Sequence, residues 1–184
     1  MEFVFVTDHD QKAFTTVAMV LRKTVRRTLN IIIRVVGCIF VAILLLFTML
    51  PFLFILLDDR EFLMLGIIVA VPVVIFFVLI IVLPFVFEDY LNGFIAKKRA
   101  LPGTARTTAV FTAEGYTITT EIAKTEYQYN SASLIVETND YFVFVLGNNY
   151  AQIFSKKGIC RGSVDYFRGF LESMTNKQLI KIKG

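Results

Sequence analysis

The spacing of apolar and polar positions divides this chain into three regions. In residues 1–30, a short apolar stretch is followed by apolar side chains that recur at steps of three and four. Residues 31–87 are almost entirely apolar apart from one charged turn. From residue 104 onward the apolar positions recur mainly at every second residue, which is the period of a strand. The pattern predicts a strand and a helix, then a helical hairpin, then a strand-rich domain.

The middle region is predicted to cross a membrane twice. Its two segments, 31–57 and 62–87, both exceed the roughly 20 residues that span a hydrocarbon core. Neither segment has the polar stripe at helical spacing that a helix facing water would show. Arg34, near the start of the first segment, can extend to the headgroups, or it can be a functional charge within the membrane. The sequence therefore predicts a transmembrane hairpin over residues 31–87.

Basic residues on both sides of the hairpin predict its orientation. The turn between the two segments carries only Arg60 among several acidic residues. Lys and Arg gather on the cytoplasmic side of membrane proteins. We therefore expect a multi-pass protein of a cell membrane with both termini cytoplasmic. The flanking basic residues include Arg22, Lys23, Arg26 and Arg27 before the hairpin and Lys97, Lys98 and Arg99 after it.

Residues 1–30 are predicted to form a strand and a basic amphipathic helix. Met1–Thr7 is rich in Phe and Val, as strands are, and the polar run Thr7–Asp10 can cap a helix. From Gln11 to about Asn30, apolar side chains lie on one side and basic ones on the other. Such a helix can lie on an anionic leaflet. Its charges can equally serve only to orient the hairpin.

Residues 88–103 are predicted to form a juxtamembrane helix and linker, and residues 104–184 a β-rich cytoplasmic domain. The turn Leu101–Thr104 marks the boundary. About six short strands follow, of which the apolar Tyr141–Leu146 is expected to be central, and Ser163 can cap a closing helix. The predicted fold class is an α+β membrane protein, a two-helix transmembrane hairpin plus a small antiparallel sheet or barrel closed by a C-terminal helix.

Several segments spread along the chain resemble one bacterial family. They are Val6–Asp10 with Phe14, Phe111–Tyr116, Tyr129–Ala132, Leu134–Thr138, Tyr141–Phe144, Ala151–Gly158 and Phe167–Leu171. Together they are similar to the YcxB-like family, although Ser155 stands where that family usually has a proline. The resemblance implies a protein of the bacterial cell membrane whose cytoplasmic domain looks like a PH-type barrel. It implies no reaction.

The sequence contains no recognisable catalytic or cofactor motif. Cys38 and Cys160 lie far apart and His9 is the only histidine, so neither a metal site nor a Cys–His pair is predicted. Phosphate-binding loops and nucleophile elbows are also missing. Nineteen basic and fifteen acidic residues give a net charge of only +4, without the basic stripe that nucleic acids require. We expect no enzyme, no cofactor, no metal and no nucleic-acid partner.

The leading functional hypothesis is a non-enzymatic integral membrane protein that presents a PH-like binding module at the inner leaflet. Its expected partners are the lipid bilayer, anionic lipid in particular, or a protein, and it can form homo-oligomers. By analogy of layout, the alternative is an immunity protein that protects the cell against a secreted membrane-active toxin or bacteriocin. The residues expected to contact the membrane surface or a partner are basic: Arg22, Lys23, Arg26, Arg27, Lys97, Lys98, Arg99, Lys156 and Lys157.

Overall fold

The chain divides into two units, which the computed structural model describes over residues 2–58, 72, 75, 76, 79, 83, 86–147, 150–175 and 177–183. For residues 44, 45 and 47–58 it gives the course of the backbone only. One unit consists of Met1–Arg26 and Asp89–Gly184, and the other of Arg27–Glu88. The N-terminal residues therefore fold together with the long C-terminal part of the chain.

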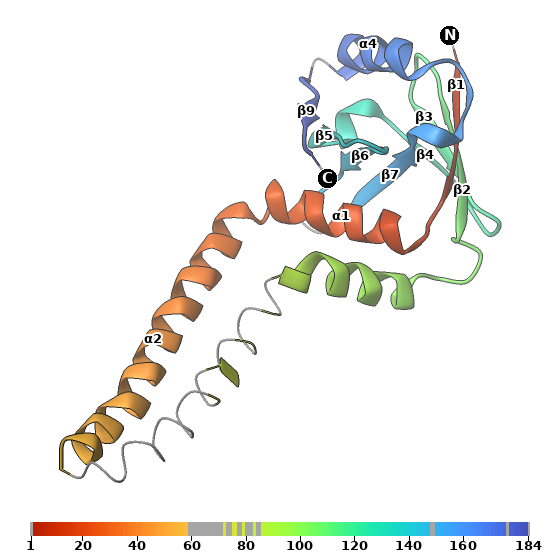
Figure 1. The fold of residues 1–184 in the computed structure, drawn as a ribbon. Coiled ribbons are helices and arrows are strands. Elements are labelled where there is room, and N and C mark those ends of the chain that lie inside the picture. Colours follow the sequence, from red (N-terminus) through yellow and green to blue (C-terminus); the bar gives the residue numbers. More distant parts are fainter. Residues whose placement is uncertain are drawn as a thin grey trace. The chain divides into compact units, whose positions relative to one another are not determined.

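The first sheet of the larger unit takes up the N-terminal strand. Its five strands are β1 (Phe3–Asp8), β2 (Arg106–Phe111), β3 (Tyr116–Thr119), β4 (Lys124–Tyr127) and β8 (Ile159–Arg161). They are antiparallel, in the order β4-β3-β2-β1-β8, and the first four strands in chain order are labelled in Figure 1. The pairing of β1 with β2 runs from Phe3 opposite Phe111 to Asp8 opposite Arg106. The N-terminal strand is thus an interior strand between two later ones.

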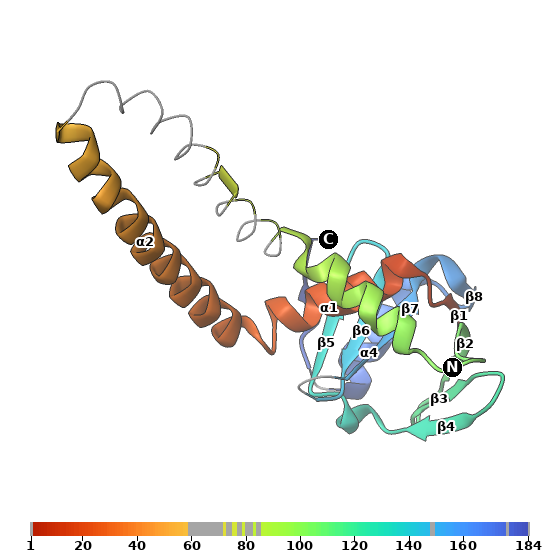
Figure 2. The same ribbon diagram turned by 90° about the horizontal axis from the view of Figure 1, so that it is seen from below.

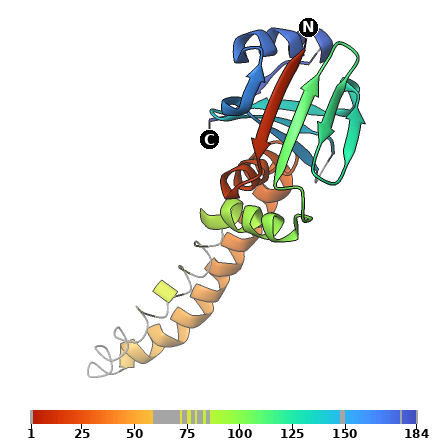
Figure 3. The same cartoon turned by 90° about the vertical axis from the view of Figure 1, so that its right-hand side faces the viewer.

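The second sheet contains the most apolar strand of the chain. Its strands are β5 (Leu134–Glu137), β6 (Tyr141–Val145), β7 (Ala151–Ser155) and β9 (Ile180–Lys181), in the order β7-β6-β5-β9. The strands of this sheet cross behind those of the first sheet in Figure 3. As predicted from its composition, β6 is an interior strand. β9, from the C-terminal tail, pairs parallel with β5.

Helices and short 3-10 turns complete the larger unit. They are α1 (Gln11–Lys23), a helical segment at residues 89–99, η1 (Tyr129–Ser131), η2 (Lys156–Gly158) and α4 (Val164–Thr175). The predicted cap of α1 is confirmed, because Asp10 Oδ1 accepts from the Ala13 N–H at 2.7 Å. Ser163 also caps α4, where its Oγ accepts from the Tyr166 N–H. Side-chain oxygens therefore set the start of both helices.

An aromatic core fills the space between the two sheets. Its centre is Phe5, whose ring lies 4.6 Å from that of Phe167 and 5.6 Å from that of Phe111, measured between centroids. Helix α4 contributes Phe167 and Leu171, which are both fully buried. The other buried members come from both sheets and from η1: Phe3, Ala109, Tyr116, Tyr129, Ala132, Ile135, Phe142, Phe144 and Phe154. Sheets and helix thus share one core.

Strand β6 is buried on both of its faces. Phe142 and Phe144 point into the aromatic core, whereas Tyr141, Val143 and Val145 belong to a second buried cluster. Helix α1 covers that second cluster with Ala13, Val20 and Leu21. This double burial explains why β6 is apolar at every position instead of alternating.

The predicted barrel is wrong, because the strands form two open sheets. After β4 the turn η1 leads the chain away from the first sheet before β5 begins. The buried Tyr129 fixes this turn, since its hydroxyl donates to the Thr112 carbonyl at 2.6 Å. A continuous closed ladder between β4 and β5 is therefore not formed.

The predicted transmembrane hairpin is also corrected. In the smaller unit, α2 spans Arg27–Asp58, but within the described part of the chain no helix has the length and apolarity to cross a membrane. The beginning of α2 carries the polar side chains Arg27, Thr28 and Asn30. It also carries Arg34, whose Nη2 lies 3.3 Å from Glu88 Oε2. Most of the second expected segment, 62–87, lies outside the described residues.

The predicted localisation rests on the same hairpin. A multi-pass protein of the bacterial cell membrane with both termini cytoplasmic requires two membrane-crossing helices. Because the described residues contain none, this localisation is corrected together with the fold class.

Candidate functional site: an outward helix face and a buried ion network

The helical segment 89–99 is held against α1 by a close backbone contact. A Cβ atom on the buried Gly93 would lie 2.6 Å from the Thr15 backbone nitrogen, so only glycine fits there. Figure 2 shows the two helices side by side. Ala96 follows Gly93 by three positions and lies on the same side of the segment, and Ala100 follows directly after its end. Small residues therefore define the face that is turned toward the rest of the unit.

Polar contacts strengthen this attachment. Arg22 on α1 forms a two-pronged ion pair with Asp89, in which Nε and Nη2 each donate to one carboxylate oxygen at 2.6 Å. Both side chains are largely buried. Gln11 Nε2 also donates to the Tyr90 carbonyl at 3.4 Å. Such planar pairing fixes direction as well as distance, so the orientation of the segment on α1 is defined.

Replacing Gly93 by alanine is expected to lower the free energy of unfolding by about 1–3 kcal/mol, because the new methyl group collides with backbone atoms of Thr15. Intrinsic helix propensity alone would give the opposite sign. Urea denaturation of the full chain measures the change. The control is Asn92→Ala at the exposed neighbouring position, where no loss is expected. Equal effects of the two substitutions would contradict the close contact.

The opposite face of the segment exposes apolar side chains. Leu91, Phe94 and Ile95 lie on one side at steps of three and four, and they are 47%, 41% and 45% exposed. Lys97, Lys98 and Arg99 follow directly and are exposed. The Lys98 ammonium lies 4.7 Å from the centre of the Phe94 ring. We call the group Leu91, Phe94, Ile95, Lys97, Lys98 and Arg99 the outward face, because it combines this exposed apolar stripe with three exposed cations that are spread around the last turn of the segment.

The structure separates the basic residues that the sequence grouped together. Lys97, Lys98 and Arg99 share the last turn of the segment, but Arg22 is engaged with Asp89 and Lys23 donates to the Lys183 carbonyl at 3.0 Å. Arg27 belongs to the other unit. The remaining members are the exposed Arg26 and Lys157 and the largely buried Lys156.

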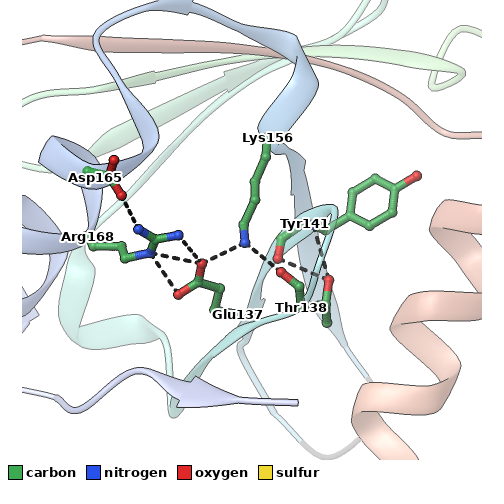
Figure 4. A network of polar contacts seen from close by, with 6 residues as sticks. All are labelled: Glu137, Thr138, Tyr141, Lys156, Asp165 and Arg168. Carbon is green, nitrogen blue, oxygen red and sulfur yellow. Dashed lines mark hydrogen bonds and ion pairs between the residues drawn. The ribbon is translucent and has the colours of Figure 1, made fainter. Parts of the chain in front are cut away.

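Lys156 takes part in a buried ion network that sequence reasoning missed (Figure 4). Its Nζ donates to Glu137 Oε1 and to the Thr138 carbonyl, each at 2.6 Å. Arg168 of α4 approaches the same carboxylate, with Nε 2.9 Å and 3.0 Å from its two oxygens. The Glu137 side chain is only 6% exposed. The network therefore joins β5, η2 and α4 around one buried carboxylate.

The cations decide the charge state of Glu137. Burial by itself raises the pKa of a carboxyl group, but the hydrogen bonds from Arg168 and Lys156 outweigh it and hold the pKa of Glu137 below its usual value. Lys156 and Arg168 therefore direct these hydrogen bonds at a carboxylate within the fold. One signal in the sequence could have revealed the site, namely a glutamate that ends an otherwise apolar strand.

No candidate metal site occurs among the residues that the structure describes. Cys38 and Cys160 are both exposed, free thiols in different units. The candidate binding surface is the outward face, whose exposed cations can attract an anionic partner.

Comparison with known proteins gives one family match, which covers part of the chain. Residues 111–171 match the family model of YcxB-like protein, so the resemblance noted from the sequence is confirmed over that segment. The match extends from the end of β2 to Leu171 of α4 and leaves out β1, α1 and the outward face. No curated protein and no solved structure matches the chain.

Proposed function

Given a chain whose residues 111–171 are YcxB-like, we propose that its larger unit is a non-enzymatic binding module for anionic lipid surfaces. The outward face carries the proposal. Its exposed leucine, phenylalanine and isoleucine can enter the headgroup region, while the three neighbouring cations meet phosphate groups. Exposed apolar patches beside charged residues are typical of surfaces that bind a partner.

Attachment of the segment supports this assignment. Since Gly93 and Asp89 fix the inner side to α1, the outward face is presented by a preorganised scaffold. Each basic residue near an anionic surface contributes about 1 kcal/mol of attraction. The C-terminal end of a helix carries a partial negative charge, and cations in its last turn interact favourably with that charge. The position of the three cations therefore stabilises the segment before any lipid is bound.

Removing two of these charges is expected to weaken binding to anionic vesicles about thirtyfold, which corresponds to about 2 kcal/mol. The variant is Lys97→Gln/Lys98→Gln in the full chain. The measurement is flotation with vesicles of phosphatidylcholine alone or mixed with phosphatidylglycerol. Higher salt should reduce the difference between the two vesicle types.

The matched control removes two charges elsewhere. Lys124→Gln/Lys181→Gln changes the net charge equally at two exposed positions on β4 and β9. We expect it to bind anionic vesicles nearly as well as the unmodified chain. Equal loss in both double variants, or equal flotation with neutral and anionic vesicles, would refute the assignment.

A further inference from the structure

A cavity of about 410 Å³ lies in the larger unit, on the inner side of the helical segment. Its lining comes from α1, from Ala96 and Ala100, and from strands β3, β4 and β7. The volume falls within the usual range of small-molecule pockets. The cavity lies on the side of the segment opposite the outward face, so a ligand in it would bind independently of any lipid at that face.

The cavity wall is apolar and uncharged. Phe14, Val17, Ile118 and Ile153 line it, and the described lining residues include no Lys, Arg, Asp or Glu. The one ionisable imidazole is His9, whose Nε2 lies 3.1 Å from Thr107 Oγ1. Burial lowers the pKa of His9, although nearby Asp8 and Asp10 oppose the shift. A charged ligand would therefore lose its hydration without gaining a counter-charge.

One polar group in this wall has an unused hydrogen bond. Gln152 is 7% exposed, and its Oε1 accepts from the Tyr116 hydroxyl at 2.7 Å. Its Nε2 is buried and has no hydrogen-bond partner among the described residues. A buried donor without a partner is unfavourable, and an acceptor on a bound molecule would relieve it.

Two tyrosines add flat surfaces to the lining. Tyr127 is half-buried, whereas Tyr150 is 56% exposed. Burial raises the pKa of Tyr127, and its interaction with Tyr150 raises it further, so these two side chains lie close together. Aromatic side chains such as these favour contact with a flat apolar molecule.

We propose that this cavity binds an uncharged, largely apolar small molecule that carries a hydrogen-bond acceptor such as a ketone or ester carbonyl. The apolar wall provides the affinity. The amide of Gln152 provides the direction, because it donates to the acceptor while Tyr116 holds its other end.

The probe for the test is prodan, an uncharged naphthalene that carries one ketone and whose emission shifts in apolar surroundings. We expect it to bind the full chain at one site. Gln152→Met keeps the length and removes both the Nε2 donor and the oxygen that accepts from the Tyr116 hydroxyl, and it should weaken prodan binding about tenfold. Displacement of prodan by 2-ethylnaphthalene, which has no acceptor, should report the same affinity for that competitor in both proteins. If Gln152→Met leaves prodan affinity unchanged, the role of the amide is refuted.

Filling the cavity gives a second, independent test. Ala123 and Thr125 line the cavity and are exposed, so Ala123→Phe and Thr125→Phe should fold and should abolish prodan binding. The matched control is Ala113→Phe, on the exposed turn between β2 and β3, which should bind as the unmodified chain does. Circular dichroism verifies the fold of each variant.

The dye could instead bind the apolar stripe of the helical segment. Leu91→Ser/Ile95→Ser distinguishes the two positions, because it alters only the outward face. If prodan binding survives both cavity-filling variants but disappears in this one, the cavity proposal is overturned.

Discussion

Replacing Phe5 by alanine is expected to destabilise the larger unit by about 3–5 kcal/mol. Phe5 is fully buried on β1, and its ring contacts those of Phe111, Phe142 and Phe167 at centroid distances of 4.6 to 6.3 Å. Its removal leaves a cavity in contact with both sheets and α4. Because the surrounding rings are held by their own strands, the space can collapse only in part.

The measurement is urea denaturation followed by far-ultraviolet circular dichroism. The control is Val4→Ala at the next position of β1, where the side chain is half-buried, and we expect a clearly smaller loss. If β1 did not belong to this core, the two substitutions would have similar small effects. The comparison therefore tests whether the N-terminal strand is an interior strand of the sheet.

Glu137→Ala is expected to lower the free energy of unfolding by about 3–5 kcal/mol, because it leaves the cations of Lys156 and Arg168 without their shared partner. Asp165→Ala is the control. Asp165 also contacts Arg168, but its side chain is 87% exposed, so its loss should change stability by about 0–1 kcal/mol. Thermal and urea unfolding of both variants measure the difference.

A triple replacement separates charge from packing. Glu137→Leu/Lys156→Met/Arg168→Leu removes the whole network and fills its volume with apolar groups. Since buried ion pairs often contribute little beyond an apolar equivalent, this variant should recover most of the stability that Glu137→Ala loses. A triple variant as unstable as Glu137→Ala would show that the ions themselves are required.

Lowering the pH should remove the contribution of the Glu137 carboxylate to the free energy of unfolding. Its pKa is lower in the folded state than the ordinary value of 4.5, so its contribution is fully present above that value and is lost as pH falls through the folded pKa. We expect the unfolding free energy of the unmodified chain to fall over this range. The Glu137→Ala variant should show a shallower fall.

Local patterns predicted several elements correctly. The polar run before Gln11 marked the cap of α1, Ser163 marked the start of α4, and the unbroken apolar stretch marked β6 as an interior strand. These features depend on residues that are adjacent in the chain or on the spacing of apolar residues, and both can be read directly from a sequence. The predicted hairpin and barrel were wrong, as the described helices and the two open sheets establish.

The candidate site was less accessible to such reasoning. Nine basic residues were grouped by charge, but only Lys97, Lys98 and Arg99 lie together on the outward face, whereas Lys156 is engaged by a carboxylate nineteen positions away. The sequence did not indicate Gln152 as a binding residue. A glutamine in a short strand can be exposed, and only the structure shows that this one is buried.

The sequence alone determined the local elements, their caps and the family resemblance over residues 111–171. Helix caps and the spacing of apolar residues depend on residues that are close together in the chain, so both can be recognised in the sequence. Only the tertiary structure decided that β1 inserts between β2 and β8, that Glu137 is shared by Lys156 and Arg168, and that Gly93 meets Thr15. Each of these contacts joins residues far apart in the chain. Their partners are selected by shape and burial in the folded state, and no local pattern carries that information.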